Sequence, residues 1–222
     1  MSAATGESIA IPVAQGQIEA DLRIPERAAG LVMFAHGSGS SRFSTRNRFV
    51  AGFLEANGFG TLLLDLLTRE EEAIDIHTRE FRFDIDRLAR RVVLATDWVQ
   101  NRKDLQPLPV GYFGASTGAA AALVAAAARS GVVRAIVSRG GRPDLANGWL
   151  QQVLAPTLLI VGGDDEPVIA MNRDAMRQMG ATVELTIVPG ATHLFEEAGT
   201  LEQVMRLSAA WFGRHFESQE DR

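Results

Sequence analysis

Apolar residues recur along this chain with two different periods, which predict strands and helices in alternation. The segments 8–13 and 18–24 alternate apolar and polar positions around Gly16, a pattern typical of a β-hairpin. Later segments that are apolar at almost every position are expected to be strands covered on both faces: 31–35, 61–64, 108–113, 132–137, 157–161 and 183–188.

Between these strands, apolar residues three or four positions apart predict amphipathic helices. The segments concerned are 47–57, 85–99, 170–179 and 201–212. The stretch 119–128 is almost pure alanine and predicts a further helix, packed closely on the sheet.

This order of elements predicts an α/β fold: a mostly parallel eight-stranded sheet with an N-terminal antiparallel hairpin and helices on both faces. The 222 residues suit a single domain over 1–222, because no linker, repeat or low-complexity run interrupts them. We expect no large cap domain, since only the segment 66–83 is long enough to overhang the sheet.

The composition limits which cellular compartment and which binding partners we expect for this protein. The net charge of −5 gives no basic surface for nucleic acid, and the absence of cysteine excludes disulfides, thiolate metal sites and a cysteine nucleophile. The first residues lack the basic and apolar pattern of a signal peptide, and no apolar run approaches the length of a membrane span. We therefore expect a cytoplasmic protein without nucleic-acid or membrane partners; its oligomeric state cannot be predicted.

One short motif carries the strongest chemical signal. A serine, Ser116, stands between Gly114 and Gly118, where the pattern changes from strand to helix. Such a turn is typical of the nucleophile of a serine hydrolase, because small neighbours permit a strained turn that lifts the hydroxyl above the sheet. The alternative is a glycine-rich turn that only packs a helix on the sheet.

A serine nucleophile needs a base, which in this kind of fold follows it on a loop after a later strand. His193 follows the strand 183–188 and is the predicted base. His77 lies in a charged helical stretch and His215 on the last helix, where solvent contact is expected. His36 precedes the serine and is expected to be a structural residue.

The acid that orients the base is less sharply defined. Asp164 and Asp165 both follow the strand 157–161, and as adjacent residues only one of them can reach His193. Asp144 is an alternative from another loop, and Glu166 precedes a proline that shapes the turn. Backbone N–H groups of Thr117 and Ser38 are the expected donors of an oxyanion hole.

Five stretches resemble the dienelactone-hydrolase-like branch of the α/β-hydrolase superfamily, in particular small serine hydrolase domains that also occur fused to phosphoribosyltransferase domains. They are 36–42, 112–119, 138–144, 162–168 and 189–195. The resemblance implies the α/β-hydrolase fold and selects Asp165 as the acid, because the family's acid follows two glycines and one variable residue. Dienelactone hydrolases proper use a cysteine nucleophile, which this chain lacks. We expect the resemblance to carry over no phosphoribosyltransferase activity, because the 222 residues suit the hydrolase domain alone.

These residues predict a serine hydrolase that cleaves an ester or related acyl bond of a small molecule through an acyl-enzyme. We expect no metal and no organic cofactor. A non-catalytic binding module on the same scaffold and an acyltransferase are the alternatives.

Arginines after several strands are expected near the same edge of the sheet: Arg42, Arg46, Arg69, Arg139 and Arg142. Of these, Arg42, Arg139 and Arg142 are candidates to bind an anionic group of the substrate. The alternative is ordinary ion pairing with nearby acidic residues.

Overall fold

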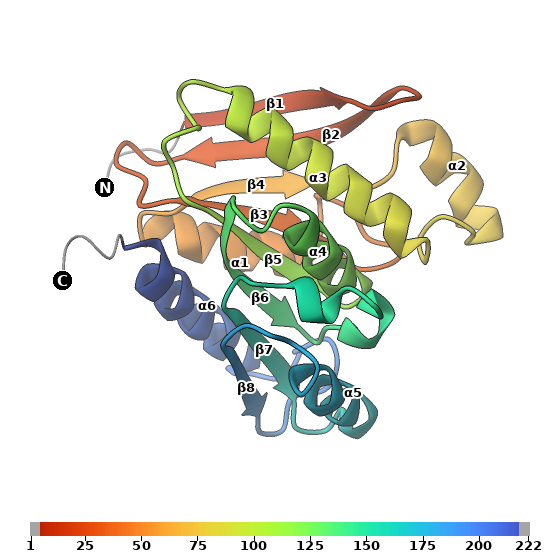
Figure 1. Cartoon of the computed structure of the whole chain (residues 1–222), viewed down its shortest axis with the longest axis vertical. Coiled ribbons are helices and arrows are strands. Elements are labelled where there is room, and N and C mark those ends of the chain that lie inside the picture. The colour runs from red at the N-terminus through yellow and green to blue at the C-terminus, as the bar shows by residue number, and fades with distance from the viewer. Residues whose placement is uncertain (1–4, 218–222) are drawn as a thin grey trace.

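The apolar runs form one eight-stranded sheet in a computed structural model that describes residues 5–217 (Figure 1). The strands are β1 (Thr5–Pro12), β2 (Gln17–Ile24), β3 (Leu31–Ala35), β4 (Gly60–Leu64), β5 (Val110–Ala115), β6 (Val133–Arg139), β7 (Thr157–Gly162) and β8 (Val183–Val188). The helices are α1 (Thr45–Ala56), α2 (Arg69–Thr78), α3 (Ile85–Asn101), α4 (Thr117–Ala128), α5 (Glu166–Met176) and α6 (Thr200–Phe216). Two short 3₁₀ helices, η1 (Pro143–Ala146) and η2 (Leu150–Gln152), precede β7.

The strand order is β1-β2-β4-β3-β5-β6-β7-β8. The hairpin β1–β2 is antiparallel and joins β4 antiparallel, whereas every pairing from β4 to β8 is parallel. Strands β3, β4, β5 and β7 are buried at every position, as sheets covered on both faces require. The predicted fold is thus confirmed, down to the antiparallel hairpin and the absence of a large cap.

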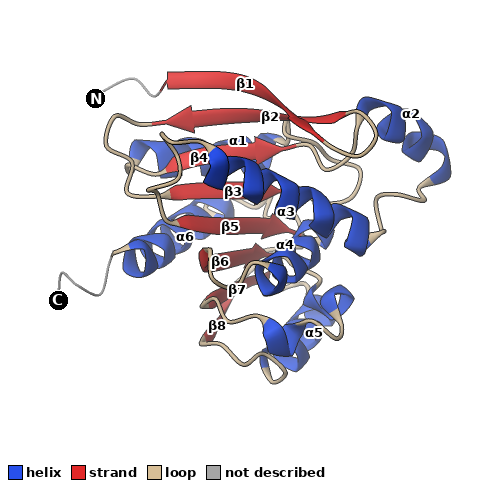
Figure 2. Ribbon diagram, turned by 45° about the horizontal axis from the view of Figure 1, so that its top comes forward, coloured by secondary structure: helices blue, strands red, loops and turns tan. Residues whose placement is uncertain are grey.

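Helices cover both faces of the sheet, with α3, α4 and α5 on one side and α1 and α6 on the other (Figure 2). The alanine-rich helix α4 is buried almost throughout, because its small side chains let it lie close to the strands. On the opposite face, Phe212 and Phe216 of α6 fill the space above Gly111, where an added Cβ would lie 2.7 and 2.8 Å from their rings. Two apolar cores, one on each side, therefore fix the sheet between its helices.

The helix predicted at 170–179 begins at Glu166 and ends at Met176, so both predicted boundaries were wrong. Its first turn contains Glu166 and Pro167, residues that suit a helix start but carry no apolar stripe. The spacing of apolar residues alone therefore could not locate the start of this helix.

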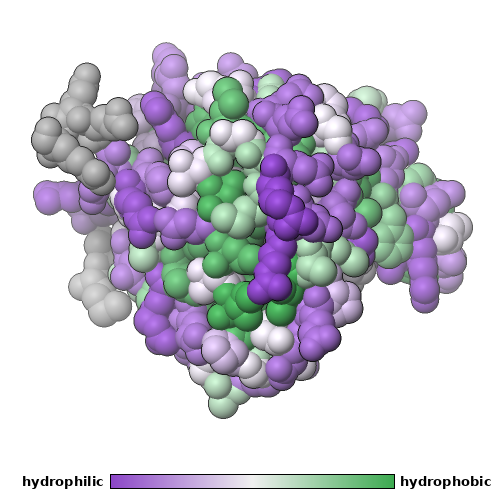
Figure 3. Space-filling view, turned by 60° about the horizontal axis from the view of Figure 1, so that its bottom comes forward, coloured by the Kyte–Doolittle hydropathy of each residue, from purple (hydrophilic) through white to green (hydrophobic). Residues whose placement is uncertain are grey.

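The side of the molecule beyond β8 carries accessible apolar surface. Strand β8 is only partly buried along most of its length. Figure 3 turns this side toward the viewer and shows apolar residues gathered in a band between polar ones. Among residues 5–217, no helix combines the length and the apolar composition that crossing a lipid bilayer requires.

Helix α2 lies beyond the carboxyl edge of the sheet (Figures 1 and 2). Thr68 and Glu71 start it with a capping box, in which each side chain bonds the other residue's backbone N–H. Glu71 also binds Arg87 and Arg91 of α3, at 2.6 and 2.7 Å. These contacts hold a largely polar helix above the ends of β3 and β4.

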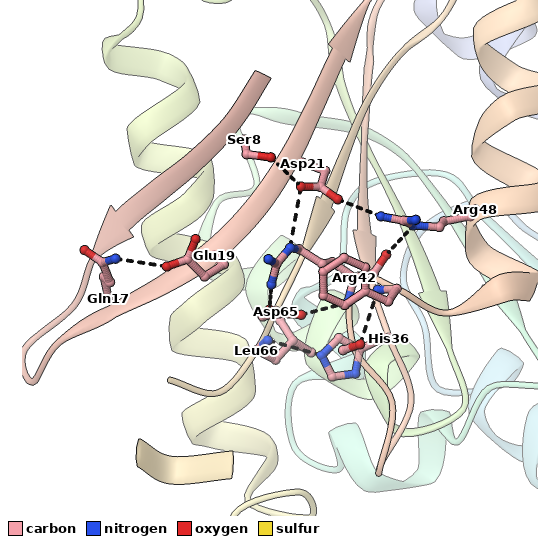
Figure 4. A network of polar contacts seen from close by, with 11 residues as sticks. Ser8, Gln17, Glu19, Asp21, His36, Arg42, Arg48, Asp65 and Leu66 are labelled. Atoms are coloured by element: carbon pink, nitrogen blue, oxygen red, sulfur yellow. Dashed lines mark hydrogen bonds and ion pairs between the residues drawn. The ribbon is translucent and has the colours of Figure 1, made fainter. Parts of the chain in front are cut away.

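A buried histidine joins the loops that follow β3 and β4. The Nδ1 of His36 lies 2.8 Å from the carbonyl oxygen of Gly37, and its Nε2 lies 3.2 Å from the amide nitrogen of Leu66 (Figure 4). A carbonyl only accepts and an N–H only donates, so Nδ1 carries the proton and Nε2 accepts. The neutral imidazole thus fits this place, as predicted for a structural residue.

Burial lowers the pKa of His36 below its ordinary value of 6.5, although the bond to Gly37 and the charge of Asp65 oppose this. Just below pH 6.5 the unfolded chain therefore binds a proton at this position and the folded chain does not. The contribution of His36 to stability is complete above pH 6.5 and is lost as the pH falls below it.

This predicts a pH-dependent difference between the wild type and His36→Gln. The gap in their free energies of unfolding, measured with urea, should shrink steadily from pH 7 to pH 5. His77→Gln, at an exposed position of α2, is the matched variant against which the change for His36→Gln is compared. A constant gap for His36→Gln would contradict the role assigned to His36.

Candidate active site

Ser116 occupies a strained turn between β5 and α4. Its φ of 51° and ψ of −122° lie in a region that residues with a side chain seldom adopt. A Cβ on Gly114 would lie 2.4 Å from the Cα of Ala119, and one on Gly118 would lie 2.2 Å from the carbonyl oxygen of Ala35. Glycine is therefore required on both sides of the serine, because backbone from the helix and from β3 fills the space.

The structure brings the three predicted catalytic side chains together at the carboxyl edge of the sheet. The Nε2 of His193 lies 3.3 Å from the Oγ of Ser116, and its Nδ1 lies 2.7 Å from Oδ2 of Asp165. Asp165 follows β7 and His193 follows β8. When Nδ1 carries the proton and donates a hydrogen bond to the carboxylate, Nε2 is unprotonated and can accept the proton of the serine hydroxyl.

The other acidic candidates lie elsewhere. Asp164 is exposed, and its backbone N–H donates to the carbonyl of Ala191. Glu166 is exposed on the first turn of α5. Asp144, on η1, pairs with Arg142. Among the acidic residues considered from the sequence, Asp165 is the one that meets His193.

The loop after β3 lies directly on the serine turn. An added Cβ on Gly37 would lie 3.2 Å from the Cβ of Ser116 and 3.3 Å from the carbonyl oxygen of Ala115. Ser38 follows in an exposed turn. Thr117 is the first residue of α4, where backbone N–H groups have no partner within the helix. Thr117 thus adjoins Ser116 in the chain, and Ser38 follows Gly37, which packs on the serine.

Two of the three candidate arginines are ion-paired. Arg42 binds Asp65 through its backbone and its guanidinium, and it approaches Asp21 at 3.5 Å (Figure 4). Arg142 binds both carboxylate oxygens of Asp144, at 2.8 and 2.7 Å. For these two residues the geometry agrees with ordinary ion pairing.

Arg139 differs, because its side chain is buried and no carboxylate within residues 5–217 pairs with it. The residue is 6% exposed, and its Nε makes no hydrogen bond within the described part of the chain. Its backbone carbonyl accepts a hydrogen bond from the amide of Ser116 at 3.2 Å. Arg139 is thus bound to the serine turn through its backbone.

Sequence reasoning missed the role of Asp75 and Arg82. Asp75 is 1% exposed and accepts bonds from the amides of Phe81 and Arg82 and, at 2.5 Å, from the Nε of Arg82. Burial raises the pKa of Asp75, but these hydrogen bonds together lower it below its ordinary value. Arg82 in turn reaches the loop after β3, since its Nη1 would lie 3.1 Å from a Cβ on Gly39. No spacing in the sequence pairs these residues.

A cavity of about 630 Å³ opens between the loop after β3 and the start of α2. Its lining includes Gly39, Ser40, Arg46, Arg69 and Glu72. Burial first, and then the like charges of Asp75 and Asp65, raise the pKa of Glu72, although the charge of Arg82 opposes this. Residues of the predicted overhang, the segment 66–83, therefore form one wall of this cavity.

The sequence matches curated relatives over most of its length. It is 54% identical over 209 residues to proteins from two strains of Mycobacterium tuberculosis, CDC 1551 and H37Rv, each named a putative phosphoribosyl transferase. The match covers 94% of this chain but 46% of each relative. The chain thus spans about half the length of these relatives.

Solved structures agree on the fold. The crystal structure of a dienelactone hydrolase from Anabaena variabilis has a TM-score of 0.94 and 55% identity, covering 96% of this chain and 99% of that one. Est1E from Butyrivibrio proteoclasticus has a TM-score of 0.78 at 15% identity, covering 94% and 98% of the two chains, and shares the fold.

A family model points the same way as the sequence motifs. The model of the dienelactone hydrolase family matches residues 18–213, nearly the whole of the chain. Together with the 55% identical dienelactone hydrolase and the α/β-hydrolase architecture, this match supports a hydrolase. The chain belongs to the dienelactone hydrolase family.

Proposed function

We propose that this protein is a serine hydrolase that cleaves an ester or related acyl bond through an acyl-enzyme. The observation that carries the proposal is the chain of contacts from Ser116 through His193 to Asp165, at 3.3 and 2.7 Å. A serine hydroxyl alone is a poor nucleophile, and this arrangement supplies the base and the acid that activate it.

In the proposed mechanism, the Oγ of Ser116 attacks the carbonyl carbon while Nε2 of His193 takes the hydroxyl proton. Asp165 holds the other ring nitrogen and stabilises the imidazolium. The N–H groups of Thr117 and Ser38 donate to the oxyanion of the tetrahedral intermediate, with the N-terminus of α4 adding a favourable dipole. Collapse expels the alcohol, which receives its proton from His193.

Water completes the cycle. His193 removes a proton from water as the oxygen attacks the acyl-enzyme, and the proton returns to Ser116 as the acid product leaves. The partial exposure of the His193 side chain, 37%, supports access for water. The name phosphoribosyl transferase belongs to relatives of about twice this length, and we do not propose that activity here.

Replacing the nucleophile should abolish turnover. Ser116→Ala should lower kcat for 4-nitrophenyl esters by roughly 10⁶ while the circular dichroism spectrum stays unchanged. Ser130→Ala is the matched control, because Ser130 is exposed beyond the opposite end of α4, and it should keep wild-type activity. A Ser116→Ala protein with a large share of wild-type activity would remove Ser116 from this role.

Neighbouring aspartates offer an internal comparison. Asp165→Asn should lower kcat by about 10⁴, because an amide favours the wrong tautomer of His193. Asp164→Asn makes the same chemical change one residue away, at an exposed position, and should alter kcat only slightly. Steady-state kinetics on one ester decide the matter, and a larger loss in Asp164→Asn would show that the acid is misassigned.

A further inference from the structure

The two edges of the sheet differ in how well they are protected. Strands β1 and β8 stand first and last in the strand order, at opposite ends of the sheet (Figure 1). In β1 the apolar residues Ile9 and Ile11 are buried, and the strand ends at Pro12, which has no N–H to offer to a further strand. In β8 the apolar residues Leu185 and Ile187 are partly exposed, and the strand contains neither proline nor glycine. Soluble proteins normally protect an edge strand against pairing, and β8 lacks such protection.

Hydrogen bonds to β7 fix the direction of the backbone groups of β8. The carbonyl oxygens of Thr182 and Val188 accept bonds from the amides of Thr157 and Gly163, at 2.9 and 2.8 Å. Backbone groups of successive residues point to opposite sides of a strand, so the even-numbered residues of β8 face β7. The N–H and C=O groups that point away from the sheet, with no further strand beside them within residues 5–217, are those of Val183, Leu185 and Ile187.

The side chains of β8 give the strand two different faces. Val188 belongs to the core on the α1 and α6 side, so Glu184 and Thr186 lie on that side as well. There Arg214 of α6 binds Glu184 at 2.8 Å, which balances the single charge of the strand. Leu185 lies on the opposite face, where α5 packs on β8.

We propose that the β8 strands of two copies of this chain pair antiparallel, so that one continuous sheet runs through a two-fold symmetric dimer. A two-fold axis through the Leu185 pair brings the outward N–H and C=O groups of both copies together. Leu185 then bonds Leu185 of the second copy, and Val183 bonds Ile187 of the second copy. The backbone groups that β8 leaves unpaired thus all find partners in this one register.

The side chains match in the same register, which favours a second copy as the occupant. On the α5 side, Leu185 meets its own symmetry mate and Val183 meets Ile187, so apolar groups contact one another. On the α6 side, Glu184 lies opposite Thr186 of the second copy, and no two like charges face each other directly. The carboxyl edges of the two sheets point in opposite directions, so both serine turns stay accessible.

Surface beside the strand adds to the contact. Strand pairing alone buries less than the roughly 1,200–2,000 Å² that a specific, stable interface needs. The apolar band around β8 extends the surface (Figure 3). Met176 of α5, a helix that packs on β8, is 36% exposed and offers a further apolar group. We therefore expect a reversible dimer that depends on protein concentration.

Sedimentation velocity between about 1 and 100 μM should show the wild type passing from monomer to dimer. Thr186→Glu should raise the dissociation constant about 10-fold or more, because a carboxylate then lies opposite Glu184 at two symmetric places. Thr186→Lys places the opposite charge at the same position and should leave the dimer as strong or strengthen it. Ala10→Lys, at an exposed position of β1, is the control for the other edge and should dimerise like the wild type.

The absence of cysteine allows a direct test of the register. Leu185→Cys places a single thiol at the two-fold axis, where facing Cα atoms are about 5.5 Å apart and within reach of a disulfide. Mild oxidation should convert most of this variant to a covalent dimer on a non-reducing gel. Ala10→Cys, on the other edge strand, should stay mainly monomeric under the same conditions.

Two results would overturn the proposal. One is a wild type that remains monomeric at the highest concentration. The other is a dimer that Thr186→Glu leaves intact and that Leu185→Cys does not cross-link, because such a dimer would use another surface. Circular dichroism on each variant shows whether a loss of dimer comes from unfolding, and cross-linking of Leu185→Cys tests the register even if Thr186→Glu fails to fold. Mass and cross-linking are measured without substrate, so the dimer stands or falls independently of the proposed hydrolase function.

Discussion

Backbone from three segments meets at the end of β5, and the site depends on that close approach. The first turn of α4, the end of β3 and the loop after β3 come so near to Ser116 that a Cβ on Gly114 or Gly118 would overlap backbone atoms. A hydroxyl lifted from a strained turn needs this support, because nothing in the local sequence favours a positive φ at serine. The same contact brings the loop with Ser38 beside the first N–H groups of α4.

Much of this architecture could be predicted from the sequence. Segments that are apolar at nearly every position predict strands buried on both faces. The motif Gly-Ala-Ser-Thr-Gly at a strand–helix junction predicts the tight turn. That Ser116, Asp165 and His193 lie at one edge then follows from the parallel sheet, because loops after parallel strands share one edge. The choice of Asp165 over Asp164 came from the family resemblance. The start of α5 could not be found, since its first turn has caps but no apolar stripe.

Contacts between charged side chains were beyond sequence reasoning. Arg42, Arg139 and Arg142 look alike in the chain. In the part of it that the structure describes, two are paired with aspartates and the third is buried with no carboxylate partner. Asp75 likewise gives no signal in its sequence, although it connects α2 to the segment that covers Gly39. Pairings such as Arg42 with Asp65 depend on distances between side chains from different elements, which periodicity and motif spacing do not encode.

The most direct test of the account is covalent labelling with a fluorophosphonate probe, followed by peptide mapping of the full chain. An activated serine beside a base should react once, on the peptide that contains Ser116, and denaturing the protein first should prevent the reaction. This result would establish the nucleophile without knowledge of the natural substrate. Labelling at another residue, or ester hydrolysis by a protein that the probe leaves unmodified, would contradict the account.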